Sequence, residues 1–224
     1  MVRKGLSSCI ESEAVEMKMH EFWNESVTEK SWEALISLSK EYEFTLIGGW
    51  AAYVWAGLHK SKDIDMVIDY NALNLLRANF NLEKNERLHK YEIKMGGFDA
   101  DIYLPGYSRL AFPLEHLKEY STVVQGFRVP LPEVLIILKQ GAEVERRGSA
   151  KGKKDLIDIL TLLVHSGFSL EKYKGILEKY KLEKLSDELE KEVLFFNPKD
   201  AEYLNLNLNE FAKWKRGFLR ELKK

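Results

Sequence analysis

Apolar and polar residues follow two different periods along this chain of 224 residues. In the first half, short apolar runs alternate with acids or end at glycines, which is typical of strands joined by turns and short helices. The strands are expected at residues 44–47, 64–70, 91–104 (two strands or one bent hairpin) and 127–129, and the helices at 50–57 and 71–82.

From position 132 onward, apolar residues recur every three or four positions, which predicts amphipathic helices. Pro132 suits the first turn of such a helix. Residues 148–152 (Gly-Ser-Ala-Lys-Gly) read as a flexible connector between two helices. The helices are expected at 132–146, 155–165, 170–180, 182–195 and 208–222.

Strands alternating with helices and then helices alone predict an α+β fold, a mixed sheet flanked by helices and followed by a helical region. Residues 1–43 are expected to form an N-terminal helical segment, most clearly at 28–42. Residues 44–130 would form the core that carries the chemistry, and residues 131–224 the helical C-terminal region.

The composition, 45% hydrophobic and 31% charged, is that of a globular protein with a real core. The net charge of -1 does not by itself indicate a nucleic-acid partner. The single cysteine, Cys9, excludes an internal disulfide and a cysteine-cluster zinc site and suits a reducing compartment. No apolar run is long enough for a membrane span, and the first residues lack the apolar core of a signal peptide. We therefore expect a cytoplasmic protein with no membrane partner.

The first candidate chemistry is the pair Gly48-Gly49, followed after thirteen residues by Asp63-Ile64-Asp65. Between a strand and a helix, glycines let a phosphate approach the backbone, and the helix start offers unpaired N–H groups. Residues i and i+2 of a strand face the same way, so Asp63 and Asp65 present two carboxylates together. Paired carboxylates plus substrate phosphates are a usual way to hold Mg²⁺.

A third carboxylate is expected from a neighbouring strand, and Asp99 and Asp101 are the candidates. Asp101 is favoured because the apolar residues after it let the strand run into the core, and Asp99 is the reserve. The alternative is that these acids cap turns or face solvent. The glycine pair before them and the second acidic strand favour the functional interpretation.

These motifs resemble the first motif of the DNA polymerase β-like nucleotidyltransferase superfamily. More narrowly, the chain resembles the AbiEii/AbiGii toxin family, because two further motifs follow in the same order. The segment from Lys139 through Ala142 to Arg146 is similar to that family's Lys-x-x-Ala-x-x-x-Arg helix. The segment Lys154-Asp155-Leu156-Ile157-Asp158 is similar to its Lys-Asp-x-x-Asp helix start. The resemblance covers residues 44–165.

The resemblance implies a role for each matching position. The metal ligands would be Asp63 and Asp65, and the ion Mg²⁺ or Mn²⁺, with Asp101 as the third acid that the second acidic strand supplies. The residues near the triphosphate would be Gly48, Gly49, Ser61 and Lys139, and Asp155 would be a further active-site acid. One position departs from the pattern: His59 stands where relatives often carry an arginine, so Lys60 or Lys62 would have to replace that phosphate contact.

Simpler interpretations exist for the second half. Lys139 and Arg146 share a helix face that could be solvated, and Asp155 could cap a helix that begins there. Arg147 and the lysines of 151–154 form a basic cluster that would suit a phosphate-rich acceptor such as RNA, or a basic loop without a ligand.

The function expected from these residues is metal-dependent transfer of a nucleoside monophosphate from an NTP to an acceptor, with release of pyrophosphate. The acceptor would be RNA (including tRNA), a protein or a small molecule. The family resemblance implies a toxin with an antitoxin protein as partner. The alternatives are a catalytically silent nucleotide- or RNA-binding module of the same fold and a structural subunit of a larger complex.

Overall fold

The computed structural model describes residues 25–224 and builds them around a five-stranded sheet in the order β1-β2-β5-β4-β3. The strands are β1 (Thr45–Ile47), β2 (Ile64–Val67), β3 (Glu83–Asn85), β4 (Lys90–Lys94) and β5 (Asp99–Tyr103). The central pair β2–β5 is parallel, while β1–β2, β3–β4 and β4–β5 are antiparallel. The sheet is therefore mixed, and the expected α+β class is confirmed.

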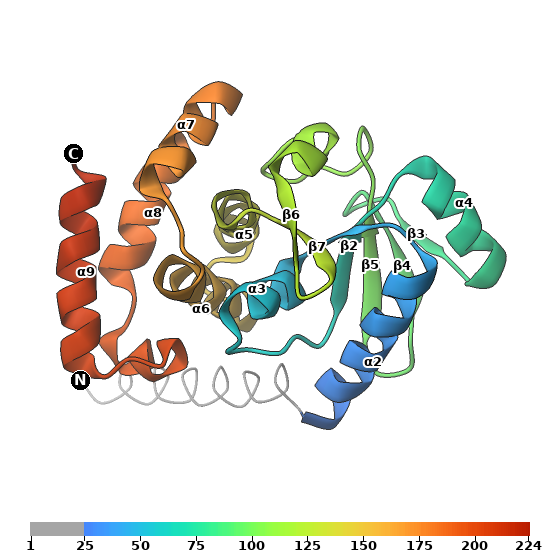
Figure 1. Ribbon diagram of the computed structural model, residues 1–224, viewed down its shortest axis with the longest axis horizontal. Helices are drawn as coiled ribbons and strands as arrows, with labels where there is room; N and C mark the ends of the chain where they lie inside the picture. Colours follow the sequence, from blue (N-terminus) through green and yellow to red (C-terminus); the bar gives the residue numbers. More distant parts are fainter. Residues whose placement is uncertain (1–24) are drawn as a thin grey trace, which may run out of the picture.

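Helices α2 (Glu25–Glu41), α3 (Gly48–Ala56) and α4 (Tyr70–Asn79) accompany the sheet (Figure 1). Trp50 of α3 is fully buried, and its indole N–H donates to the Ser31 hydroxyl of α2 at 2.9 Å. Helix α3 ends at Gly57, whose φ of 73° is the left-handed conformation that glycine adopts without strain. The apolar residues of α3 therefore fix it between the sheet and its neighbouring helices.

The second half is helical and lies beside the sheet, with α5 and α6 between the sheet and the outer helices (Figure 1). Helices α5 and α6 pack on each other, and α3 packs on both. The outer helices are α7 (Leu170–Tyr180), α8 (Lys184–Phe195) and α9 (Leu208–Leu222), and the inner ones α5 (Pro132–Arg146) and α6 (Ala150–His165). No helix of residues 25–224 has both the length and the apolar character to cross a membrane.

Smaller elements link the two halves. They are the 3₁₀ helices η1 (Leu114–Tyr120) and η2 (Pro198–Leu204) and the hairpin of β6 (Ser121–Val124) with β7 (Phe127–Pro130). Strands β3 and β6 and both 3₁₀ helices escaped the sequence prediction, because their short segments carry no clear apolar period. The expected hairpin over 91–104 is confirmed by β4 and β5.

The predicted flexible connector at 148–152 is wrong, because α6 begins at Ala150. The Ser149 side chain caps the helix by accepting from the Gly152 N–H at 3.1 Å, so the helix starts one and a half turns before Asp155. Gly152 has to be glycine here, since a Cβ would collide with the Arg146 carbonyl. The helix expected before residue 25 and Cys9 lie outside the described residues, and the three-part division of the chain stays a prediction.

A buried polar cluster joins α5, α7 and α8. The side chain of Gln140 donates to Glu192 at 3.0 Å and accepts from the Tyr173 hydroxyl at 2.6 Å. Glu192 is 4% exposed, and its second carboxylate oxygen has no hydrogen-bond partner among the described residues. Burial, and then the charge of Glu143, raise the pKa of Glu192 to about 8. The folded protein therefore keeps this acid protonated at neutral pH.

Glu192→Gln is expected to stabilise the protein at alkaline pH. The folded pKa lies above the ordinary value, so the wild type loses stability as pH rises from about 4.5 to about 8. Glutamine cannot ionise, so the variant should gain on the order of 2 kcal/mol in urea unfolding at pH 8 and little at pH 5. Glu188→Gln, one turn earlier on α8 and ion-paired to Arg147 and Lys191, is the control and should show no such gain.

Candidate active site

The residues singled out from the sequence meet at one cavity of about 290 Å³ between the sheet and the helical half. The lining includes Gly48, Gly49, Ser61, Asp63, Asp65, Asp101, Lys139 and Asp155. These residues come from the ends of β1 and β2, the middle of β5 and the facing helices α5 and α6. Positions more than 100 residues apart in the sequence therefore share one site.

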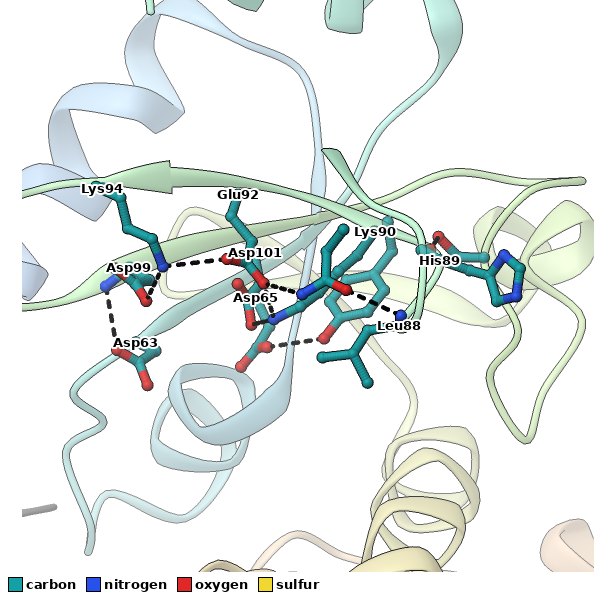
Figure 2. Close-up of polar contacts among 12 residues, drawn as sticks. Asp63, Asp65, Leu88, His89, Lys90, Glu92, Lys94, Asp99 and Asp101 are labelled. Carbon is teal, nitrogen blue, oxygen red and sulfur yellow. Dashed lines mark hydrogen bonds and ion pairs between the residues drawn. The ribbon is translucent and has the colours of Figure 1, made fainter. Parts of the chain in front are cut away.

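One wall of the cavity is acidic because of the register of three adjacent strands. Asp65 of β2 lies opposite Asp101 of β5, and Asp101 lies opposite Glu92 of β4. Register partners present their side chains on the same face of a sheet. The three carboxylates therefore form a row across the sheet, of which Asp65 and Asp101 line the cavity and Glu92 lies next to it without lining it (Figure 2). Glu92 was missed in the sequence because its place depends on the pairing of β4 with β5.

The structure separates the two candidates for the third acid. Asp101 lines the cavity, whereas Asp99 does not. The carboxylate of Asp99 is 39% exposed and pairs with Lys94 at 2.8 Å, and its backbone N–H donates to the Asp63 carboxylate at 3.1 Å (Figure 2). Asp99 thus ties Asp63 to the start of β5, and Asp101 remains the preferred third acid.

Burial and neighbouring charges raise the pKa values of two carboxylates of the acidic wall. Burial, and then the charge of Asp101, raise the pKa of Asp65 to about 7, against the attraction of Lys139. Burial also raises the pKa of Asp101, although Lys90 pulls it down. A cation at this wall would relieve the repulsion between the two carboxylates.

These donors fit Mg²⁺, which is usually held by one or two carboxylates together with substrate phosphates and waters. Asp65 and Asp101 would be the ligands, with Asp63 beside them at the same cavity. Within residues 25–224, no group of three or more acidic, histidine or cysteine side chains is arranged to hold an ion by itself.

The start of α3 forms a second side of the cavity. Its N-cap residue, Ile47, makes no side-chain cap to the first N–H groups of the helix, and Ile47, Gly48 and Gly49 all line the cavity. Gly48 has a φ of 68°, and a Cβ there would overlap the Asp65 carboxylate. A Cβ on Gly49 would overlap the Ser61 hydroxyl. Both glycines allow the helix start to pack directly on site residues.

Gly48→Ala should displace Asp65 and lower transfer activity by at least about tenfold, in addition to a backbone cost of about 1–2 kcal/mol at positive φ. Gly57→Ala is the matched control: its φ of 73° imposes the same strain at the other end of α3, but a Cβ there meets nothing within 4 Å. Turnover and urea unfolding of both variants separate the two effects. Equal activity in the two alanine variants would contradict the contact with Asp65 as its cause.

The opposite wall is cationic and centres on Lys139 of α5. Lys139 is 6% exposed, and its ammonium donates to Asp158 at 2.6 Å and to Asp155 at 3.1 Å. Burial disfavours its charge, but these carboxylates outweigh that effect and hold the pKa of Lys139 above its usual value. The interpretation of Lys139 on a solvated face is therefore wrong.

Asp155 lies in the second turn of α6 rather than at its start, so the interpretation of Asp155 as a helix cap is also wrong. Its carboxylate is buried and bound by both Lys139 and Arg146. Although Asp155 lines the cavity, these partners make it a positioning residue for the two cations. Lys154 completes the group by pairing with Asp158 at 3.4 Å.

Several cavity residues escaped the sequence analysis. Lys90 and Tyr103 stand on β4 and β5, and Arg109 comes from the loop after β5. That loop reaches the cavity because Gly141 of α5 leaves room for Ala111. Tyr103 could have been found, because it stands two residues after Asp101 on an expected strand and so shares its face. Lys90 could not, because its place beside Asp101 depends on the register between β4 and β5.

His59, Lys60 and Lys62 have different surroundings in the structure. The ring Nε2 of His59 hydrogen-bonds to the backbone carbonyl of Tyr203 at 2.6 Å, so the histidine is engaged with η2. Lys62 lines the cavity and Lys60 does not. Of the two lysines expected to replace the arginine, Lys62 is therefore the one at the cavity.

The basic cluster at 147–154 is largely neutralised. Arg147 pairs with Glu143 and Glu188, Lys153 pairs with Asp200, and Lys154 pairs with Asp158. Of this cluster, Lys151 is exposed, lines the cavity and forms no ion pair with the described residues. The cluster thus offers a phosphate-rich acceptor less charge than its sequence suggests.

Comparisons with known proteins find solved structures that are similar to this chain, but no matching sequence family. No family model and no curated protein matches the chain. JHP933 from Helicobacter pylori is similar at 19% identity over 87% of this chain and 91% of that one, with a TM-score of 0.49. An antigenic nucleotidyltransferase-like protein from Paracoccidioides brasiliensis is similar at 16% identity over 81% and 91%, with a TM-score of 0.37. A chain from H. pylori described as a candidate nucleotidyltransferase is similar at 19% identity over 89% and 97%, with a TM-score of 0.49. Similarity at such low identity and TM-score does not support assigning an activity to this chain. The function therefore has to be argued from the cavity itself.

Proposed function

We propose that this protein is a metal-dependent nucleotidyltransferase that moves a nucleoside monophosphate from an NTP to an acceptor. The observation that carries the proposal is the pairing of two walls across one cavity of about 290 Å³. The wall of Asp63, Asp65 and Asp101 suits a divalent ion, and the wall of Lys139, Arg146 and Lys154 suits the phosphates that accompany it. The open N-terminus of α3 between them supplies backbone donors for the same anion.

The proposed roles follow from these positions. Asp65 and Asp101, with Asp63, would hold Mg²⁺ or Mn²⁺. When bound, the ion would neutralise phosphate charge and favour attack by the acceptor oxygen. The N–H groups of Gly48 and Gly49 would bind the triphosphate, with Ser61 and Lys62 beside them. Lys139, held by Asp155 and Asp158, would present a fixed positive charge to the same phosphates.

In the transfer itself, an acceptor oxygen forms a bond to the α-phosphorus of the NTP as the bond to the bridging α–β oxygen breaks. Pyrophosphate leaves with the electron pair of that bond. When the acceptor is a hydroxyl, its proton passes to a carboxylate of the acidic wall, and we assign this role to Asp101. Such catalysis consists of positioning and charge neutralisation.

The acceptor in this proposal is an RNA (including tRNA), a protein or a small molecule. Arg109, Lys151 and the partly exposed Arg146 at the cavity offer the positive charge available to it. A role as a toxin, controlled by an antitoxin protein, rests on the resemblance to the AbiEii/AbiGii family alone. Growth arrest on expression of the wild type, absent for Asp65→Asn, would support that role, and equal growth of both strains would count against it.

The direct test is transfer of label from each of the four α-³²P-labelled NTPs to molecules of a cell extract, with Mg²⁺ or with EDTA. The proposal expects Mg²⁺-dependent labelling by the wild type and at least about 100-fold less by Asp65→Asn. Binding of NTPs without transfer, in any extract, would instead support the catalytically silent module. Identification of the labelled molecule would then name the acceptor.

A further inference from the structure

Lys90 lies over the middle of the acidic row, where it contacts two of the three carboxylates. Its ammonium is 2.5 Å from an Asp101 oxygen and 3.1 Å from a Glu92 oxygen (Figure 2). All three side chains are largely shielded, with exposures of 11% for Lys90, 15% for Asp101 and 14% for Glu92. Lys90 also lines the cavity, whereas Lys94, two residues later on β4, does not.

The backbone around Lys90 is held so that this side chain reaches the row. His89, just before it, has a φ of 49°, a left-handed conformation that is unfavourable for a non-glycine residue. The His89 carbonyl accepts from the Ser108 hydroxyl at 2.6 Å, and that hydroxyl accepts from the Leu104 N–H at 3.0 Å. The start of β4 is thus fastened to the loop that follows β5.

We propose that Lys90 is an internal counter-cation of the active site: it neutralises Asp101 in the metal-free protein and releases it when the divalent ion binds. This inference rests on the proposed function. A row of shielded carboxylates without a cation is strongly unfavourable, and a lysine on a flexible stem supplies one positive charge without closing the site. Unlike a fixed arginine fork, it can move away.

Glu92 is the carboxylate that Lys90 can still pair with when it leaves Asp101. Lys90 already touches Glu92, and Glu92 is itself fixed by the Asn85 amide at 2.9 Å. When Asp101 turns to the metal ion, Lys90 keeps a charged partner in Glu92. The cost of releasing Asp101 is therefore a shift between two neighbouring carboxylates, rather than exposure of an unpaired ammonium.

The test is Mn²⁺ binding to the purified full-length protein, with and without an α,β-methylene NTP analogue, measured by the loss of the EPR signal of free Mn²⁺. Lys90→Met removes the competing charge and should bind Mn²⁺ about tenfold more tightly than the wild type. Lys94→Met is the matched control, because it removes the same charge from the same strand and breaks contacts with Glu92 and Asp99 outside the cavity. Its Mn²⁺ affinity should stay within about twofold of the wild type.

Thermal unfolding of the same proteins gives a second readout that does not depend on activity. Without metal, Lys90→Met should unfold at a lower temperature than Lys94→Met, and Mn²⁺ should raise its midpoint more than it raises that of the wild type. Glu92→Gln should act in the opposite direction: it leaves Lys90 committed to Asp101 and weakens Mn²⁺ binding by about threefold. If Lys90→Met does not fold, Glu92→Gln becomes the test of the proposal, and Mn²⁺ binding as tight as that of the wild type would contradict it.

Failure of this proposal is distinct from failure of the proposed function. If the wild type binds Mn²⁺ and Lys90→Met binds it no more tightly than Lys94→Met does, Lys90 is not a competing cation, while metal-dependent transfer stands. If neither the wild type nor Lys90→Met binds Mn²⁺ even with the NTP analogue present, the metal site itself is wrong, and both proposals fall.

Discussion

Asp65→Asn is expected to lower the rate of nucleotidyl transfer by about 10²–10³-fold. Asp65 stands at the centre of the site, opposite Asp101 in the strand register and in contact with the start of α3 at Gly48. Asparagine keeps the shape of the side chain but removes the charge that a divalent ion requires. The fold should persist, because the substitution also removes repulsion from Asp101 and Asp63.

Asp99→Asn is the control for this prediction. Asp99 lies two residues before Asp101 on the same strand and has the same charge, but its carboxylate pairs with Lys94 outside the cavity. Its transfer rate should stay within about threefold of the wild type, since removing an exposed ion pair costs little. The assignment of Asp65 to the metal would fail if its variant turned over as fast as Asp99→Asn.

Lys139→Met is expected to destabilise the protein by about 3–5 kcal/mol, because it leaves two buried carboxylates without their shared cation. Asp155 and Asp158 are each 1% exposed, and the remaining cations, Arg146 and Lys154, contact only one of them each. Urea unfolding at neutral pH measures the loss.

Removing the negative charge of Asp158, which Lys139→Met leaves without its main partner, should restore part of this stability. The double variant Lys139→Met/Asp158→Asn is expected to recover at least about 1–2 kcal/mol relative to Lys139→Met, since Asp158 forms the shorter contact with Lys139. Asp187→Asn, an exposed acid of α8, serves as the comparison and should recover nothing. A Lys139→Met protein as stable as the wild type would show that the buried cluster does not depend on this cation.

Local signals in the sequence were sufficient for much of the fold. Pro132 and the apolar period after it fixed α5, and Gly57 marked the end of α3, because helix starts and stops depend on residues close to them. Where a competing local signal was overlooked, the prediction failed: Ser149 caps α6, so Gly152 lies inside a helix rather than in a connector.

The same distinction between local signals and long-range packing applies to the residues of the candidate site. Asp63 and Asp65 could be found because their spacing of two residues implies a common face on one strand. The place of Lys90 and Glu92 depends on how β4 pairs with β5, which no short segment specifies. The burial of Lys139 likewise depends on the packing of α5 on α6, where Asp155 and Asp158 reach it from a different helix.

The most direct test of the two-walled cavity is calorimetric titration of the protein with α,β-methylene NTP analogues, which bind but cannot transfer. With Mg²⁺ present, at least one of the four analogues should bind to the wild type with micromolar affinity. Removal of the metal by EDTA, or the Asp65→Asn substitution, should weaken that binding by at least about tenfold, because the triphosphate would then face the carboxylates without the ion. Binding that is equally tight without metal and in Asp65→Asn, or no binding of any analogue with Mg²⁺, would contradict the assignment of this cavity to a metal-bound nucleotide.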